Sequence, residues 1–175
     1  MESKTNDLLN LIKSRRSVRN FVYKKIDNQT IKEIIDCGRW APSGRNNQPW
    51  KVQIVSHPTV KRMIAENTEY GGIVESAFLN LVVFLDLERG YDRVKDILAM
   101  GAFIQNMLLA VHAKGLGAVW IGEILKNKEK ICEIFKFSPD KYELMGVITV
   151  GIIDESLEQK EERERRPLEE FIDWY

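Results

Sequence analysis

The segment Asp92–Gly115, DRVKDILAMGAFIQNMLLAVHAKG, holds the longest helical pattern in the chain. From Ile97 to Val111 it is apolar on nearly all sides. A helix of this kind has to be buried over most of its surface, either in a core or in a subunit interface. We therefore predict a helix over Asp92–Lys114, closed by the glycine that follows, with the rest of the fold arranged around it.

Strand and helix patterns lie on both sides of this segment. Alternating apolar and polar residues predict a strand, a dense apolar run predicts a buried strand, and apolar residues at helical spacing predict a helix. Asp27 is a typical N-cap, and Tyr70–Gly72 is expected to break a helix. The predicted strands cover residues 50–55, 78–85, 119–121 and 144–153. The predicted helices cover 5–14, a segment between Asp27 and Gly38, 126–135, and a segment starting near Pro58 in which Val60, Met63 and Ile64 face inward. This mixture favours an α+β sandwich with helices packed over a small sheet.

Composition excludes several classes of protein. Of the 175 residues, 44% are hydrophobic and 30% are charged, which is typical of one folded domain. The 26 Lys and Arg residues balance the 26 Asp and Glu residues, so a nucleic-acid partner is not expected. No run approaches the roughly 18 apolar residues of a membrane span, and the charged N-terminus does not look like a signal peptide. We expect a cytoplasmic protein that does not bind a membrane.

Cysteine and histidine usage predicts neither a metal site nor a disulfide framework. The chain has 2 Cys and 2 His residues, and none of them has metal-ligand spacing. Cys37 and Cys132 are interpreted as small buried apolar residues in a reducing cytoplasm.

Two basic clusters could bind an anion. Arg15, Arg16 and Arg19 fall within five residues around Ser17. Guanidinium groups this close repel one another, and phosphate is the anion that their planar fork suits best. A second cluster at the end of a charged segment contains Arg163, Arg165 and Arg166. Either cluster could instead be a solvated surface, and the second is more typical of a linker.

Two further segments could contact a flat heterocycle. The loop Pro42–Trp50, PSGRNNQPW, is rich in polar side chains and backbone N–H groups, although an ordinary structured turn has the same composition. The small residues of Gly115–Gly122, GLGAVWIG, would let a ligand approach the backbone closely.

These segments, taken in order, resemble the nitroreductase family of flavoenzymes. The resemblance rests on RRSVRNF from Arg15, APSGRNNQPW from Ala41, GLGAVWIG from Gly115 and RERRPLEEF from Arg163, and it spans nearly the whole chain. It implies a single FMN-binding domain over residues 1–175, a central, mostly antiparallel sheet flanked by helices, and an intertwined homodimer. Residues 154–175 would then be a charged linker and a C-terminal arm packed on the partner subunit.

The resemblance also implies a set of cofactor-binding residues. The opening motif would hold the FMN phosphate, ribityl chain and pyrimidine edge, the proline–serine loop would reach the flavin of the other subunit, and the late arginines would bind phosphate. The segment after the long helix would contact the reactive N5 side of the flavin. The residues concerned are Arg15, Arg16, Ser17, Arg19, Pro42, Ser43, Gly44, Asn46, Ile121, Gly122, Arg163 and Arg165.

Two positions depart from the family pattern. Tyr70 stands where an asparagine beside the flavin is common, so we assign it to the substrate pocket, where it would stack on or gate the ring. Phe78 stands where a proline is common. The chain also lacks the insertion with which many members shape their substrate pocket.

The implied function is electron transfer from NADH or NADPH, through FMN, to a nitroaromatic, quinone or related small acceptor by a ping-pong mechanism. The cofactor carries the chemistry, so no side chain is named as catalytic. Three alternatives stay open. They are another flavin reaction on the same scaffold (dehalogenation, dehydrogenation or flavin fragmentation), a non-enzymatic FMN-binding protein, and a small interaction domain with surface arginines.

Overall fold

The fold is built on one antiparallel sheet. The computed structural model describes residues 2–157 and 163–175. Within them, five strands pair in the order β1 (Phe21–Val22), β5 (Tyr142–Ile153), β3 (Leu79–Asp86) and β2 (Trp50–Val55), and β4 (Gly117–Ile121) pairs with β5 beside β1. Every pairing is antiparallel, which confirms the predicted sheet.

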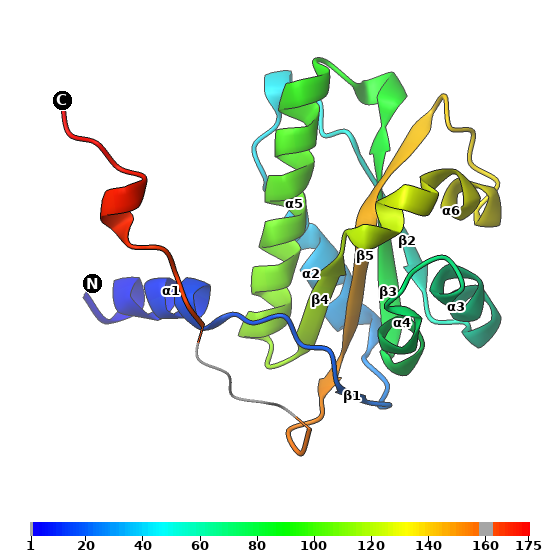
Figure 1. Ribbon diagram of the computed structural model, residues 1–175, viewed down its shortest axis with the longest axis horizontal. Coiled ribbons are helices and arrows are strands. Elements are labelled where there is room, and N and C mark those ends of the chain that lie inside the picture. The colour runs from blue at the N-terminus through cyan, green and yellow to red at the C-terminus, as the bar shows by residue number, and fades with distance from the viewer. Residues whose placement is uncertain (1, 158–162) are drawn as a thin grey trace.

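Helices cover both faces of the sheet (Figure 1). Strand side chains alternate between the faces, so Leu81 and Val83 join one core while Val82 and Phe84 join the other. The first core packs under α2 (Asn28–Gly38) and α5 (Arg93–Ala113), and the second packs under α3 (Pro58–Ala65), α4 (Gly71–Ser76) and α6 (Lys128–Ile134). The α+β sandwich expected from the sequence is therefore confirmed.

Helix α5 is the main core helix of the first layer. By length and composition alone it could span a membrane, but Met100, Phe103 and Ile104 are almost completely buried against the sheet layer. This burial identifies it as a core helix of this fold. Val94 and Leu98 on its outer side are each 68% exposed, so an apolar face of α5 remains uncovered in the single chain.

Most sequence-predicted features are confirmed, with four corrections. Cys132 is buried as predicted, but Cys37 is exposed, because it lies in the last turn of α2 on the side away from the core. The helix from Pro58 ends at Ala65, and the glycines expected only to break it instead begin α4. Met63 was predicted to face inward but is 41% exposed, because it lies on the outer side of a helix whose inner face carries Ile64. Strand β1 was not predicted, since two residues are too few to show alternation.

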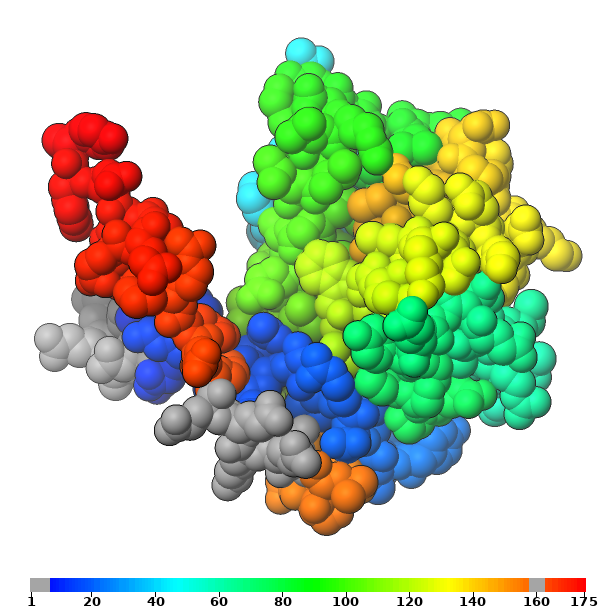
Figure 2. All heavy atoms as spheres, viewed as in Figure 1, coloured from blue at the N-terminus to red at the C-terminus, as the bar shows by residue number. Residues whose placement is uncertain are grey.

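Two segments project from the body (Figures 1 and 2). Helix α1 (Glu2–Ser14) and the C-terminal residues 163–175 lie beside each other and away from the sheet. Both carry exposed apolar side chains, including Leu8, Ile12, Phe171 and Trp174. Residues 158–162 of the predicted charged linker lie outside the described part of the chain. A projecting arm with apolar side chains is typical of a segment that packs on a second subunit.

Candidate functional site

The first basic cluster lies where α1 ends and the chain enters the body. Arg15 and Arg16 are half-buried, whereas Ser17 and Arg19 are exposed. The Arg19 guanidinium donates back to the Ser17 carbonyl oxygen at 3.5 Å. The predicted knot is therefore a folded turn, with its side chains divided between a crevice and the surface.

The structure brings the second basic cluster to the first. The Arg163 guanidinium donates to the carbonyl oxygens of Arg15 and of Lys13, the latter at 2.5 Å, so it caps the C-terminus of α1. Burial, together with the charges of Arg163 and Arg165, lowers the pKa of Arg15 from its ordinary value. Three cations from segments about 150 residues apart are thus held in one place, which is the condition for binding an anion such as a phosphate ester.

His112 belongs to the same cluster, although the sequence did not suggest it. It lies in the last turn of α5, and its Nε2 is 2.9 Å from the Ser14 hydroxyl oxygen. Together with Arg16 these side chains line a crevice of about 90 Å³. Burial and the charges of Arg15 and Arg163 lower the pKa of His112. A lone histidine on an apolar helix gives no sequence signal of a contact across the fold.

Strand β4 connects this cluster to the second part of the site. The backbone N–H of Val18 donates to the Ala118 carbonyl at 2.9 Å, so the turn after the arginines lies on the first residues of β4. From there β4 extends to Ile121, and Gly122 follows roughly 13 Å from Ala118 at the rise of a β-strand. A ligand with an anionic group near Arg15 could therefore extend along β4.

The glycines of this segment divide into two kinds. A Cβ on Gly117 would lie 2.7 Å from Val18 Cγ1, so this glycine serves close packing inside the fold and does not open space for a ligand. The sequence interpretation of Gly117 is thereby corrected. Gly115 has φ +68° where α5 ends, and a Cβ on Gly115 or on Gly122 would meet no atom within 4 Å. The backbone after β4 therefore faces open space.

Hydrogen bonds link Tyr70 to the residue that follows this open backbone. Its backbone N–H donates to the Thr68 hydroxyl at 3.2 Å, and that hydroxyl donates to the Glu123 carboxylate at 2.6 Å. Glu123 directly follows Gly122 and begins a short 3₁₀ helix, Glu123–Asn127. The structure thus joins the residue predicted for the substrate pocket to the glycine predicted for cofactor contact, and the Tyr70 side chain is 45% exposed.

The proline–serine loop is strained and firmly held. Three of its non-glycine residues have left-handed backbone angles, Arg45 at φ 52°, Asn46 at 55° and Gln48 at 49°, each at a cost of about 1 kcal/mol. The Ser43 hydroxyl accepts from the Gln48 N–H at 3.1 Å. The Arg45 guanidinium lies 4.2 Å above the centre of the Tyr91 ring.

A buried carboxylate anchors this loop to α5. Asp96 is 2% exposed and accepts from the Asn47 side chain at 2.7 Å and from the backbone N–H groups of Tyr91 and Asp92 at 2.7 and 3.0 Å. Its burial opposes the charged form, but these hydrogen bonds together hold its pKa below the ordinary value. No role was predicted for Asp96, because an acidic residue in the first turn of a helix is common.

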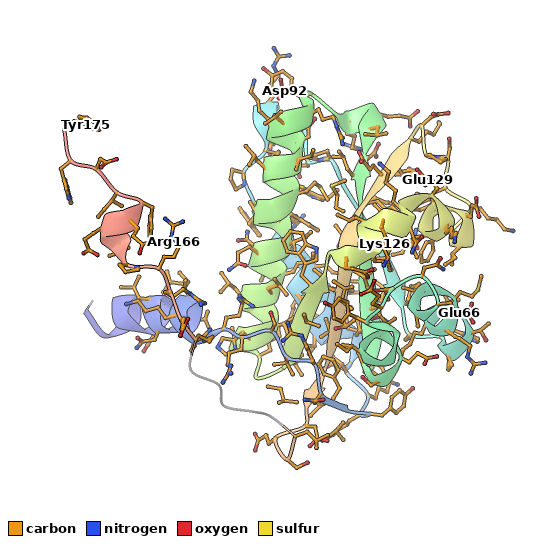
Figure 3. All side chains as sticks on the ribbon, viewed as in Figure 1. Glu66, Asp92, Lys126, Glu129, Arg166 and Tyr175 are labelled. Carbon is orange, nitrogen blue, oxygen red and sulfur yellow. The ribbon has the colours of Figure 1, made fainter. Side chains whose placement is uncertain are left out.

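The loop and the basic cluster lie at opposite ends of α5. Asp96 contacts the loop and His112 contacts the basic cluster, and sixteen helical residues separate them by roughly 24 Å. Figure 3 shows Asp92 at one end of α5, and Arg166 on the arm segment beside α1. Within one chain the exposed Pro42, together with Ser43, Gly44 and Asn46, therefore does not join the other predicted site residues.

Comparison with known proteins identifies the family to which the sequence is similar. A model described as the nitroreductase family matches residues 12–152. YfhC of Bacillus subtilis, whose name proposes an NAD(P)H nitroreductase, is 29% identical over 87% of this chain and 88% of its own length. A Methanothermobacter thermautotrophicus relative, whose name proposes an NADH dehydrogenase or NAD(P)H nitroreductase, is 32% identical over 66% of this chain and 61% of its own length.

Solved structures show the same fold. A Desulfovibrio desulfuricans protein, whose name proposes a nitroreductase, was crystallised in complex with FMN; it is 37% identical, with a TM-score of 0.88 over 94% of each chain. A Clostridium acetobutylicum protein, whose name proposes an NADH oxidase, is 26% identical, with a TM-score of 0.82 over 94% of this chain and 99% of its own.

Proposed function

Because this chain belongs to the nitroreductase family, we propose that it is an FMN-dependent oxidoreductase of the NAD(P)H nitroreductase type. It would pass electrons from NADH or NADPH to a nitroaromatic, quinone or related small acceptor, with donor and acceptor using one site in turn. The observation that carries the proposal is the convergence of Arg15, Arg163 and Arg165 at one end of a strand that leads to the open backbone at Gly122.

The residues present fit FMN. A phosphate monoester would relieve the repulsion among the three arginines, and a flat ring would meet the open backbone at Gly122. A ligand that reached both positions would be elongated, with an anionic end. When bound, FMN supplies the two-electron chemistry of the reaction.

Each part of the chain has a binding or orienting task. Arg15, Arg163 and Arg165 would hold the phosphate, and Ser17, Arg16 and Arg19 the ribityl chain and pyrimidine edge. Cations at that edge favour a more negatively charged cofactor and so favour its reduction. Ile121 and Gly122 would position the ring, and Tyr70 would form a wall of the acceptor pocket. No side chain is required to transfer a proton.

The proposal includes a homodimer. The proline–serine loop lies roughly 24 Å along α5 from the basic cluster, so Pro42, Ser43, Gly44 and Asn46 would complete the site of a second subunit. The exposed apolar residues of α1, the arm and the outer side of α5 would be covered in that dimer, including Leu9, Ile12, Val94, Leu98 and Phe171. The C-terminal arm would pack on the partner, and the dimer would act in the cytoplasm on small molecules.

The test is the visible absorption spectrum of the purified protein before and after anaerobic addition of NADH or NADPH. We expect flavin bands that bleach on addition and return when a nitroaromatic or quinone is added. Bands that persist with both nicotinamides would support a non-enzymatic FMN-binding protein instead. A protein that stays colourless after incubation with FMN would overturn the proposal.

A further inference from the structure

One acidic side chain joins the two sides of the proposed acceptor pocket. Glu123 Oε2 accepts from the Thr68 hydroxyl at 2.6 Å and from the Glu69 backbone N–H at 3.2 Å. Its other oxygen pairs with Lys126, which also pairs with Glu69 at 2.7 Å. Residues of the loop before α4 are thus attached to the 3₁₀ helix that follows Gly122.

A second bond fixes the same two segments. The Asn127 side chain donates to the Asn67 carbonyl at 2.9 Å, so both ends of the 3₁₀ helix contact the loop before α4. Figure 3 shows Lys126 on the segment between β4 and α6. The Glu123 side chain is 24% exposed, so its bonds are only partly screened by water.

The network involves every residue of the loop 67–70. The loop 67–70 lies outside the sheet, and a loop at the surface is normally mobile and variable. Here each of its four residues takes part in a bond to the 3₁₀ helix or in the bond from Tyr70 to Thr68. These bonds attach the loop that carries Tyr70 to the 3₁₀ helix that follows Gly122.

We propose that Glu123 is a positioning residue, which sets the width of the acceptor pocket by holding Tyr70 at a fixed distance from the Gly122 backbone. The inference rests on the proposed function, since it assigns Gly122 to the cofactor and Tyr70 to the acceptor pocket. Glu123 itself does not contact the acceptor. Its ionised form is the one that accepts both loop hydrogen bonds and pairs with Lys126, and these bonds lower the pKa of its carboxyl group.

The experiment compares Glu123→Gln, Glu123→Ala and Thr68→Val holoprotein with the wild type. We expect Glu123→Ala and Thr68→Val to raise the acceptor KM roughly tenfold, with the dissociation constant of FMN and the rate of flavin reduction by nicotinamide nearly unchanged. Glu123→Gln keeps an acceptor oxygen for Thr68 and should give an intermediate KM. Thr68→Val changes no charge, so it remains informative if Glu123→Ala folds poorly.

The matched control is Glu143→Gln. Glu143 also pairs with two cations, Arg93 at 2.6 Å and Lys128 at 3.2 Å, but it contacts neither side of the pocket. We expect this variant to lower the melting temperature and to leave the acceptor KM unchanged.

The outcomes separate the two proposals. An unchanged acceptor KM in both Glu123→Ala and Thr68→Val, with a normal wild type, would overturn the positioning role alone. Variants that lower the melting temperature and leave the acceptor KM unchanged would likewise overturn the positioning role. A wild type without reducible FMN would overturn the proposed function and, with it, the inference.

Discussion

Arg15 is the residue on which the basic cluster depends, because it contributes both its charge and the carbonyl that receives Arg163. Replacing it with alanine should weaken FMN binding by about 10- to 100-fold, the range expected for a charge-assisted hydrogen bond. Binding of riboflavin, which has no phosphate, should change far less. Titration of the apoprotein with each flavin measures both. Arg166→Ala is the control, since Arg166 pairs with Glu170 at 3.0 Å; equal losses in the two variants would contradict the assignment.

A substitution at Gly122 should affect ligand binding without affecting the stability of the fold. Alanine here meets no protein atom, so the free energy of unfolding of the apoprotein should change by less than about 1 kcal/mol. If a flat ring occupies that space, FMN affinity should fall by roughly tenfold or more through overpacking. Gly117→Ala should show the reverse pattern, because its Cβ would strike Val18. In this variant the free energy of unfolding should fall more than the FMN affinity does. Thermal melts with and without FMN measure both effects, and unaltered FMN affinity in Gly122→Ala would remove the ring from this position.

His112 should make the protein sensitive to mild acid. Its pKa in the folded protein lies below the ordinary value of 6.5, so the unfolded chain binds the proton more readily. The contribution of His112 to the stability of the folded state is therefore fully present above about pH 6.5, and it is lost as the pH falls through the pKa of the folded protein. Urea midpoints between about pH 8 and pH 5 should decline less in His112→Gln than in the wild type. Equal slopes in the two proteins would rule out His112 as the cause.

Among the elements, the loop 42–49 depends most on one distant side chain. Asp96→Asn would place an amide N–H against the Asn47 amide, or leave the backbone N–H groups of Tyr91 and Asp92 without their acceptor. The expected loss is about 2 to 4 kcal/mol of unfolding free energy, with the strained loop released first. Denaturant unfolding and proteolysis at the loop measure it. Asp92→Asn keeps a good N-cap and should cost much less; similar losses in both would contradict the anchoring role.

The elements also show what the sequence could and could not predict. Periodicity predicted the long helix, four strands and the N-cap at Asp27, because each follows from local chemistry. It placed Met63 inward wrongly, since local spacing does not tell which side of a short helix meets the core. The resemblance implied that Arg15 and Arg163 both bind phosphate, and this role stays a prediction; in the structure the Arg163 guanidinium donates to the Arg15 carbonyl oxygen. Asp96, His112 and Glu123 had no sequence signal, because each acts through a partner far along the chain.

For the whole molecule, the separation of loop and cluster along α5 predicts sites shared between subunits. Subunits with Arg15→Ala and subunits with Asp96→Asn should each assemble into dimers that bind FMN weakly. After subunit exchange at equal amounts, half of the dimers are hybrids in which one of two sites carries neither substitution, so about a quarter of wild-type flavin binding should return. Equilibrium dialysis with FMN measures the recovery. No recovery after proven exchange would place each site within one chain.

The same separation links cofactor occupancy to protein abundance. If neither subunit alone completes a site, dilution below the dissociation constant of the dimer releases flavin along with the partner. In that regime the amount of active protein rises with the square of the amount synthesised. A cell that doubled its expression would then gain nearly four times the activity. The distance between the two ends of one helix would thus convert a modest change in expression into a steep metabolic response.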